Sequence, residues 1–219
     1  MNGPNVPAPA GRTRGYDLAR AFAIIGMVFI NFPIYLTPAA DSAGSLLAWL
    51  SGIHYGRAAA LFVTLAGAGV AMMARGADRG AVRRTLLLRA GFLFVAGHLL
   101  IQVWRIDILH FYAVYLALAA LLFLGLGRRA LLAAIALVMA VTVAVVMVAP
   151  ELEAGGVAYY RLGEELTALE RLAGLLQNVL FSGIHPVFPW IAFLLAGLWI
   201  GSHDIRDAAT RRRLLALGA

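Results

Sequence analysis

Four of the five histidines lie near the ends of long apolar segments, where an imidazole could take part in proton transfer. They are His54, His98, His110 and His185, and Asp107 precedes one of them by three residues. Side chains three residues apart on a helix can touch, so this carboxylate can fix the tautomer of His110 and raise its basicity. A neutral histidine held in this way is a common general base. The pattern predicts acid–base chemistry, although each histidine alone could instead serve as a hydrogen-bond donor between helices.

The first apolar segment carries a second polar pair. Asn31 follows Arg20 by 11 residues, which places both within about 20° of one helix face and roughly 16 Å apart along its axis. An amide can donate a hydrogen bond to a developing oxyanion, and an arginine can bind phosphate. Asn31 is therefore a candidate for stabilising an oxyanion, and interhelical hydrogen bonding is an equally good interpretation of it.

Several other kinds of chemistry are disfavoured. The chain has no cysteine, which excludes a thiolate nucleophile, a disulfide framework and a cysteine-based metal site. The spacing of the histidines matches no recognised ligand motif, so we predict no metal. The net charge is +7, but the basic residues follow the loops between apolar segments instead of forming a basic face with interleaved aromatic groups. We therefore predict no nucleic-acid partner.

The elements that must position these residues are membrane helices. Of the 219 residues, 62% are hydrophobic and 13% are charged, against about 45–50% and 25% in a soluble domain. A lipid core about 30 Å thick needs about 20 helical residues. Six apolar runs of about this length are found at residues 18–36, 57–74, 86–104, 106–126, 130–149 and 187–200. The sequence predicts an all-α, polytopic membrane helix bundle with six spanning helices.

The arginines predict the topology. Fourteen of the 18 fall on one side of the six segments, and basic loops resist translocation and stay in the cytoplasm. Both termini are then cytoplasmic, and the four histidines lie in the outer half. The absence of lysine and the abundance of Ala, Gly, Val and Arg favour a GC-rich bacterial genome, so we expect a multi-pass protein of the bacterial cytoplasmic membrane.

Three regions follow from this topology. We expect a cytoplasmic tail at residues 1–17, a transmembrane domain at 18–200, and at 201–219 either a cytoplasmic tail or the start of a further span beyond this chain. Within the domain, leucines recur at spacings of three, four and seven residues over about 160–181. This spacing predicts an amphipathic helix that lies on the outer surface or covers a cavity mouth.

Four stretches together resemble one superfamily of membrane acyltransferases, the YeiB-like and heparan-α-glucosaminide N-acetyltransferase-like proteins. The segment from Asp17-Leu-Ala-Arg20 to Asn31 resembles their first span, and residues 57–69 resemble their second. The other two stretches resemble the His…Trp…Asp-Ile-Leu…Tyr-Ala and Pro-Trp…Gly signatures: Gly97-His98, Trp104 and Asp107-Ile-Leu-His-Phe-Tyr112-Ala113, then His185-Pro-Val-Phe-Pro189-Trp190 with Gly197 and Gly201.

The resemblance implies transfer of an acyl or acetyl group from a CoA-type donor to an acceptor hydroxyl or amine at the outer face. In the heparan branch, an Asn at the end of the first span and a His in the following loop form the catalytic pair. Asn31 matches the former, and His54 is the only histidine in the corresponding loop. His98, or His110 held by Asp107, is the second choice for the base.

Other partners follow from the same hypothesis. Arg20, Arg83 and Arg84 would guide the donor, and His185 and Trp190 would contact a small-molecule or glycan acceptor. Acyl-CoA is then a substrate, and no permanently bound cofactor is expected. Besides the lipid bilayer, a homo-oligomeric partner is left open by the sequence.

Two other functional classes fit the same polar residues. In a transporter or exporter they would line a permeation route, and in a non-catalytic assembly subunit they would only fix helix partners. Two further patterns have structural interpretations. Ala66-Gly-Ala-Gly69 predicts close helix packing through small residues, and Tyr112 and Tyr115 predict an aromatic belt with Trp104.

Overall fold

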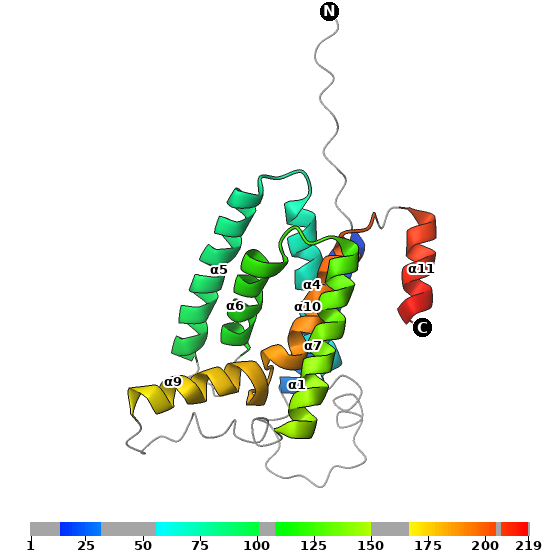
Figure 1. The fold of residues 1–219 in the computed structure, drawn as a ribbon. Coiled ribbons are helices and arrows are strands. Elements are labelled where there is room, and N and C mark those ends of the chain that lie inside the picture. The colour runs from blue at the N-terminus through cyan, green and yellow to red at the C-terminus, as the bar shows by residue number, and fades with distance from the viewer. Residues whose placement is uncertain (1–13, 32–55, 101–107, 150–166, 205–206, 219) are drawn as a thin grey trace, which may run out of the picture. The chain divides into compact units, whose positions relative to one another are not determined.

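The structure is a computed structural model, and it describes residues 14–31, 56–100, 108–149, 167–204 and 207–218. The regular structure within these ranges is helical (Figure 1). The elements are α1 (Arg14–Asn31), α4 (Arg57–Ala74), α5 (Arg79–Leu100), α6 (Leu109–Leu118) continued by the π-helical turn η1 (Ala119–Phe123), α7 (Arg128–Val148), α9 (Ala168–Gln177) continued by η3 (Asn178–Ser182), α10 (Val187–Gly201) and α11 (Ala208–Gly218).

Each predicted apolar run overlaps one of these helices. The bounds of α4 coincide with the prediction, whereas α5 begins at Arg79, ahead of the expected residue 86, because arginine is a good helix former and the helix continues beyond its apolar part. Within the described ranges, two helices, α4 and α7, are long and apolar enough to cross a membrane. A third span results if α9–η3 and α10, which are bent by 54° at their break, count together.

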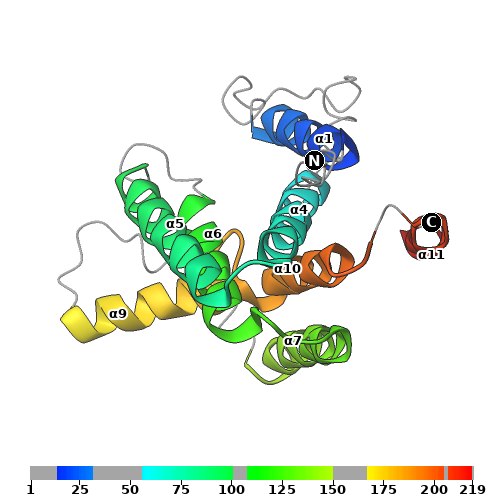
Figure 2. The same ribbon diagram turned by 90° about the horizontal axis from the view of Figure 1, so that it is seen from above.

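The chain divides into two compact units, Met1–Leu65 and Ala66–Ala219. The first contains α1 and the beginning of α4, and the second contains the remaining helices. The core of the second unit is formed by α6 and α10, where Phe111, Tyr115, Leu194 and Leu195 are at most 1% exposed. In this unit α5 packs against α6, and α7 packs against α10 (Figure 2).

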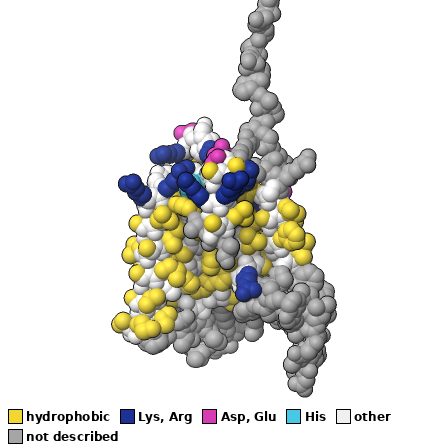
Figure 3. All heavy atoms as spheres, turned by 90° about the vertical axis from the view of Figure 1, so that its right-hand side faces the viewer, with side chains coloured by type: hydrophobic (Ala, Val, Ile, Leu, Met, Phe, Trp, Pro, Cys, Tyr) yellow, Lys and Arg dark blue, Asp and Glu magenta, His cyan; other side chains and the backbone are white. Residues whose placement is uncertain are grey.

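The outward faces of the second unit are apolar. On α5, four large side chains at helical spacing, Leu88, Phe92, Val95 and Leu99, are all exposed. Hydrophobic side chains cover much of the face shown in Figure 3, and most of the visible arginines gather along one edge of it. A surface of this kind is stable when lipid is the solvent. The helices and this surface agree with a multi-pass membrane protein.

Small residues allow the second half of α4 to approach α10 closely. A Cβ atom added to Gly67 would lie 2.0 Å from the carbonyl oxygen of Leu194, and one added to Gly201 would lie 2.8 Å from the carbonyl oxygen of Ala68. No side chain larger than hydrogen fits at either position without a shift of backbone. The prediction of close helix packing by this glycine- and alanine-rich segment is confirmed.

Arginines cap the C-terminal end of α10. A terminal guanidinium nitrogen of Arg75 donates to the carbonyl oxygens of Gly201 and His203, and Arg128 donates to the carbonyl oxygen of Ser202 at 2.8 Å. The last carbonyls of a helix lack partners within the helix and carry partial negative charge. These two arginines satisfy them. Beyond this end, backbone and side-chain hydrogen bonds from Thr210 lower the pKa of the Asp207 carboxyl, which precedes α11.

Candidate functional site

Three of the four predicted site histidines come together within the second unit. The ring centroids of His98, at the end of α5, and His110, at the start of α6, are 5.7 Å apart with the rings edge to face. His110 also lies 4.0 Å from the ring of Phe111, which in turn is 6.4 Å from the ring of His185. We call His98, His110 and His185 the histidine cluster. The ring of Phe111 lies between His110 and His185.

His98 is oriented by its own helix. Its Nδ1 lies 3.0 Å from the carbonyl oxygen of Phe94, one turn earlier, and its ring contacts the ring of Phe94 at a centroid distance of 4.2 Å. A carbonyl oxygen accepts only, so this contact assigns the proton to Nδ1 and leaves the lone pair on Nε2. In this tautomer His98 can accept a proton through Nε2, as a general base must. His110 is 3% exposed, so its imidazole is shielded from solvent.

His185 occupies the turn at the break between η3 and α10. The hydroxyl of Tyr115 on α6 donates to its carbonyl oxygen at 2.5 Å, which fixes the turn against α6. Its ring lies edge to face with the indole of Trp190 at 4.5 Å. Among the described residues, its buried Nδ1 atom has no hydrogen-bond partner. A buried polar atom in this condition costs about 1–3 kcal/mol, which makes His185 a candidate for a functional role.

The prediction that Tyr115 belongs to an aromatic belt is wrong. Its side chain is 0% exposed and forms part of the core instead of a membrane interface. The hydroxyl is retained there because the carbonyl oxygen of His185 accepts its hydrogen bond. Sequence reasoning missed this residue as a support of the site, and its nearness to His110 in the chain was the available signal.

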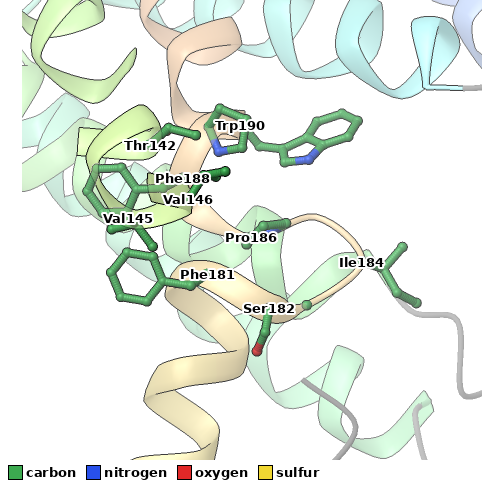
Figure 4. A pocket seen from close by; sticks show the side chains of 11 residues that line it. Thr142, Val145, Val146, Phe181, Ser182, Ile184, Pro186, Phe188 and Trp190 are labelled. Carbon is green, nitrogen blue, oxygen red and sulfur yellow. The ribbon is translucent and has the colours of Figure 1, made fainter. Parts of the chain in front are cut away.

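A cavity of about 260 Å³ lies next to the histidine cluster. It is lined by one face of α7, by η3, by the turn that contains His185 and by the first turn of α10 (Figure 4). Trp190, which was predicted to contact the acceptor, is among its lining residues, and it also contacts the His185 ring. The cavity residues on α7 and η3, such as Thr142 and Phe181, were not predicted, because hydropathy shows only that these segments are apolar.

The remaining predicted catalytic residues cannot be placed against the cluster. Asn31 is the last residue of α1 in the first unit, and its side chain is outside the described part of the chain. His54 and Asp107 also lie outside the described residues. The roles assigned to these three residues remain predictions.

The arginines assigned to the donor lie on two helices. Arg20 on α1 is 4.0 Å from Asp17, and both side chains are substantially exposed. On α5, the Nε atom of Arg83 donates to the carbonyl oxygen of Ala120 in η1 at 3.1 Å, so this arginine also joins two helices. Arg84 is exposed. Across the described ranges, no group of three or more metal-ligating side chains is placed to hold an ion.

The fold and this cluster describe a helical membrane protein with a histidine site beside a cavity. The model of one protein family, described as "Heparan-alpha-glucosaminide N-acetyltransferase, catalytic", matches residues 12–217. The chain therefore belongs to this family, and the resemblance noted in the sequence is confirmed. No curated protein and no solved structure matches the chain.

Proposed function

We propose that this protein is a membrane acetyltransferase that moves the acetyl group of acetyl-CoA to a hydroxyl or amine acceptor at the outer face. Family membership supports acetyl transfer. The histidine cluster is the observation that supports this site. Its His98 ring is held in the tautomer with the proton on Nδ1, and the neighbouring His110 ring is shielded from solvent. These are the features of a proton acceptor that works away from bulk water.

The reaction needs one base and one oxyanion donor. A neutral histidine of the cluster takes the proton of the acceptor hydroxyl or amine as its oxygen or nitrogen attacks the thioester carbon. The oxyanion donor expected from the sequence is the Asn31 amide, and such an interaction is commonly worth about 2.7–4 kcal/mol. The C–S bond then breaks, the CoA thiolate takes up the proton from the histidine, and acetylated acceptor and free CoA thiol are the products. His54, the first choice from the sequence, lies outside the described residues and is the alternative base in this proposal.

The donor enters from the arginine-rich side in this proposal. Arg84 and His98 are 14 residues apart on α5, about 21 Å along its axis. A CoA molecule bound through its phosphates near Arg84 would need to extend its pantetheine arm along the helix to reach the cluster. Arg83 would add positive charge beside Arg84, and Arg20 would do so at the cytoplasmic end of the first predicted span.

The proposed orientation completes this picture. In this proposal the chain has six spans, and both termini lie in the cytoplasm of a bacterium. The arginine-rich loops are then cytoplasmic, and the histidine cluster lies in the outer half of the membrane. The excess of arginine in alternate loops supports this topology. The helix α10 has 15 residues, about 22 Å, so its span would be completed by the bent α9–η3 segment.

Reconstitution tests the proposed function. The full chain is placed in liposomes with acetyl-CoA labelled in its acetyl group, and amine and hydroxyl acceptors are supplied on the opposite side. We expect label on an acceptor and an equal amount of free CoA thiol. Flux of an acceptor across the membrane without thioester cleavage would contradict the proposal and favour a transporter.

A further inference from the structure

The cavity lies beside His185, one member of the histidine cluster. Ile184 and Pro186, which flank His185 in the chain, line the cavity, and so does Trp190, whose indole lies 4.5 Å from the His185 ring. A molecule held in the cavity would therefore end beside the histidines. The cavity lies wholly within the second unit.

Most of the side chains that line the cavity are apolar, whereas polar atoms make up more of its exposed surface than apolar atoms do. The rings of Phe181 and Phe188 stack at a centroid distance of 5.5 Å and an interplanar angle of 12°, and valine side chains of α7 lie opposite η3 (Figure 4). Two hydroxyls are present, but both already donate within their helices, Thr142 to the carbonyl oxygen of Val138 and Ser182 to that of Gln177.

The mouth of the cavity opens on a surface suited to lipid. Two residues that line it, Val146 on α7 and Ile184 in the turn, are 40% and 52% exposed, so the cavity reaches the molecular surface between them. Along the whole of α7, a helix long and apolar enough to span a membrane, only Leu131 and Val138 are buried. The alkyl chains of lipids that surround α7 are thus continuous with the cavity.

The size of the cavity restricts its occupant. Ligand sites for drug-sized molecules are commonly about 300–1,000 Å³. At about 260 Å³ this cavity lies just below that range, which is enough for one segment of alkyl chain. The polar main chain of the turn, next to His185, would then face the head group of the same molecule.

We infer that this cavity binds an alkyl chain of a membrane lipid, and that the acceptor of the acetyl group is the amine or hydroxyl carried by that lipid. The second statement rests on the proposed function. For an amine, the head-group ammonium first releases one proton to solvent. The neutral nitrogen then attacks the thioester carbon and gives a second proton to the histidine cluster, which passes it to the departing CoA thiolate.

Photolabelling tests the binding of lipid without acetyl transfer. The full chain is reconstituted in vesicles of phosphatidylethanolamine and phosphatidylglycerol that contain a trace of phosphatidylethanolamine with a diazirine in one alkyl chain. After irradiation, we expect label on the segment 181–190. V146W places an indole in the mouth and should reduce this labelling severalfold. V143W is the matched control, because Val143 is exposed on the same helix and does not line the cavity. Equal labelling of the segment in V146W and the wild type would overturn the inference.

Acetyl transfer to the lipid tests the identity of the acceptor. With labelled acetyl-CoA added, we expect acetylated phosphatidylethanolamine in the wild type and V143W and severalfold less in V146W. Transfer to a water-soluble amine that V146W leaves unchanged would overturn the lipid-borne acceptor and leave the proposed function standing. Labelling of the cavity without transfer to any acceptor would support lipid binding and contradict the proposed function. Equal thermal unfolding temperatures of the two variants show that both are folded.

Discussion

The imidazoles of His98 and His110 lie edge to face at 5.7 Å, although one closes α5 and the other opens α6. The packing of these two helices holds them together. The carbonyl oxygen of Phe94 accepts the proton on Nδ1 of His98, so Nε2 is the basic nitrogen of this ring. The two rings therefore form a specific target for mutation.

Replacement of either histidine by asparagine should remove the proposed base. We expect H98N or H110N to lower the rate of acetyl transfer by about 10²–10⁴-fold, the usual contribution of general base catalysis. H203Q is the control, because His203 follows the other end of α10 and bonds to the carbonyl oxygen of Trp199. The measurement is release of CoA thiol by the reconstituted protein. If both cluster variants turned over at the rate of H203Q, His54 would become the base to test.

The hydroxyl of Tyr115 should stabilise both the fold and the turn around His185. Y115F removes the hydrogen bond to the His185 carbonyl oxygen while keeping the ring. We expect the free energy of unfolding to fall by about 1 kcal/mol and the rate of transfer to fall as the turn loosens. Thermal unfolding in detergent and the CoA-release assay measure the two effects. An unchanged unfolding temperature would show that the hydroxyl does not hold this turn.

The close approach of α4 to α10 should make Gly67 intolerant of any side chain. In G67A the new Cβ would overlap the carbonyl oxygen of Leu194, so we expect a loss of at least 1–3 kcal/mol, roughly the cost of overpacking. G91A is the matched control on α5, because nothing lies within 4 Å of a Cβ added there. That variant should be neutral or more stable by about 0.4–1 kcal/mol. Equal unfolding temperatures for the two variants would contradict the close packing.

Neighbouring arginines on α5 should separate stability from donor binding. R83Q removes the hydrogen bond to the Ala120 carbonyl oxygen and should cost roughly 1 kcal/mol, at the low end for a charged donor because the arginine is exposed. R84Q should leave the unfolding temperature unchanged and raise the KM for acetyl-CoA. Unfolding and saturation kinetics measured on both variants check this pair. A KM for acetyl-CoA that stays constant in R84Q would remove Arg84 from the donor site.

Sequence reasoning located the helices well because hydropathy and charge report directly on which segments can lie in lipid. The bounds of α4 agree with the prediction, and α7 begins and ends within two residues of it. It also singled out four histidines near segment ends as site candidates. In the structure the rings of His98 and His110 lie 5.7 Å apart, and the ring of His185 lies 6.4 Å from that of Phe111.

The supports of the site were not predictable in the same way. Tyr115 and Thr142 lie in segments that are apolar throughout, and hydropathy does not show which face of a helix meets which neighbour. The break between η3 and α10, which lines the cavity, depends on how η3 and α10 pack against each other. The pairing of distant helices decides these features, and one sequence does not contain that pairing explicitly.

The arginine bonds at the end of α10 restrict the loops of this protein. Arg75 directly follows α4, and Arg128 is the first residue of α7, yet both bind carbonyl oxygens in the stretch from Gly201 to His203. Three helix ends are therefore pinned to a common level. A single residue inserted near either arginine would pull its guanidinium away from the carbonyls, so these surface connections should tolerate substitutions far better than changes in length.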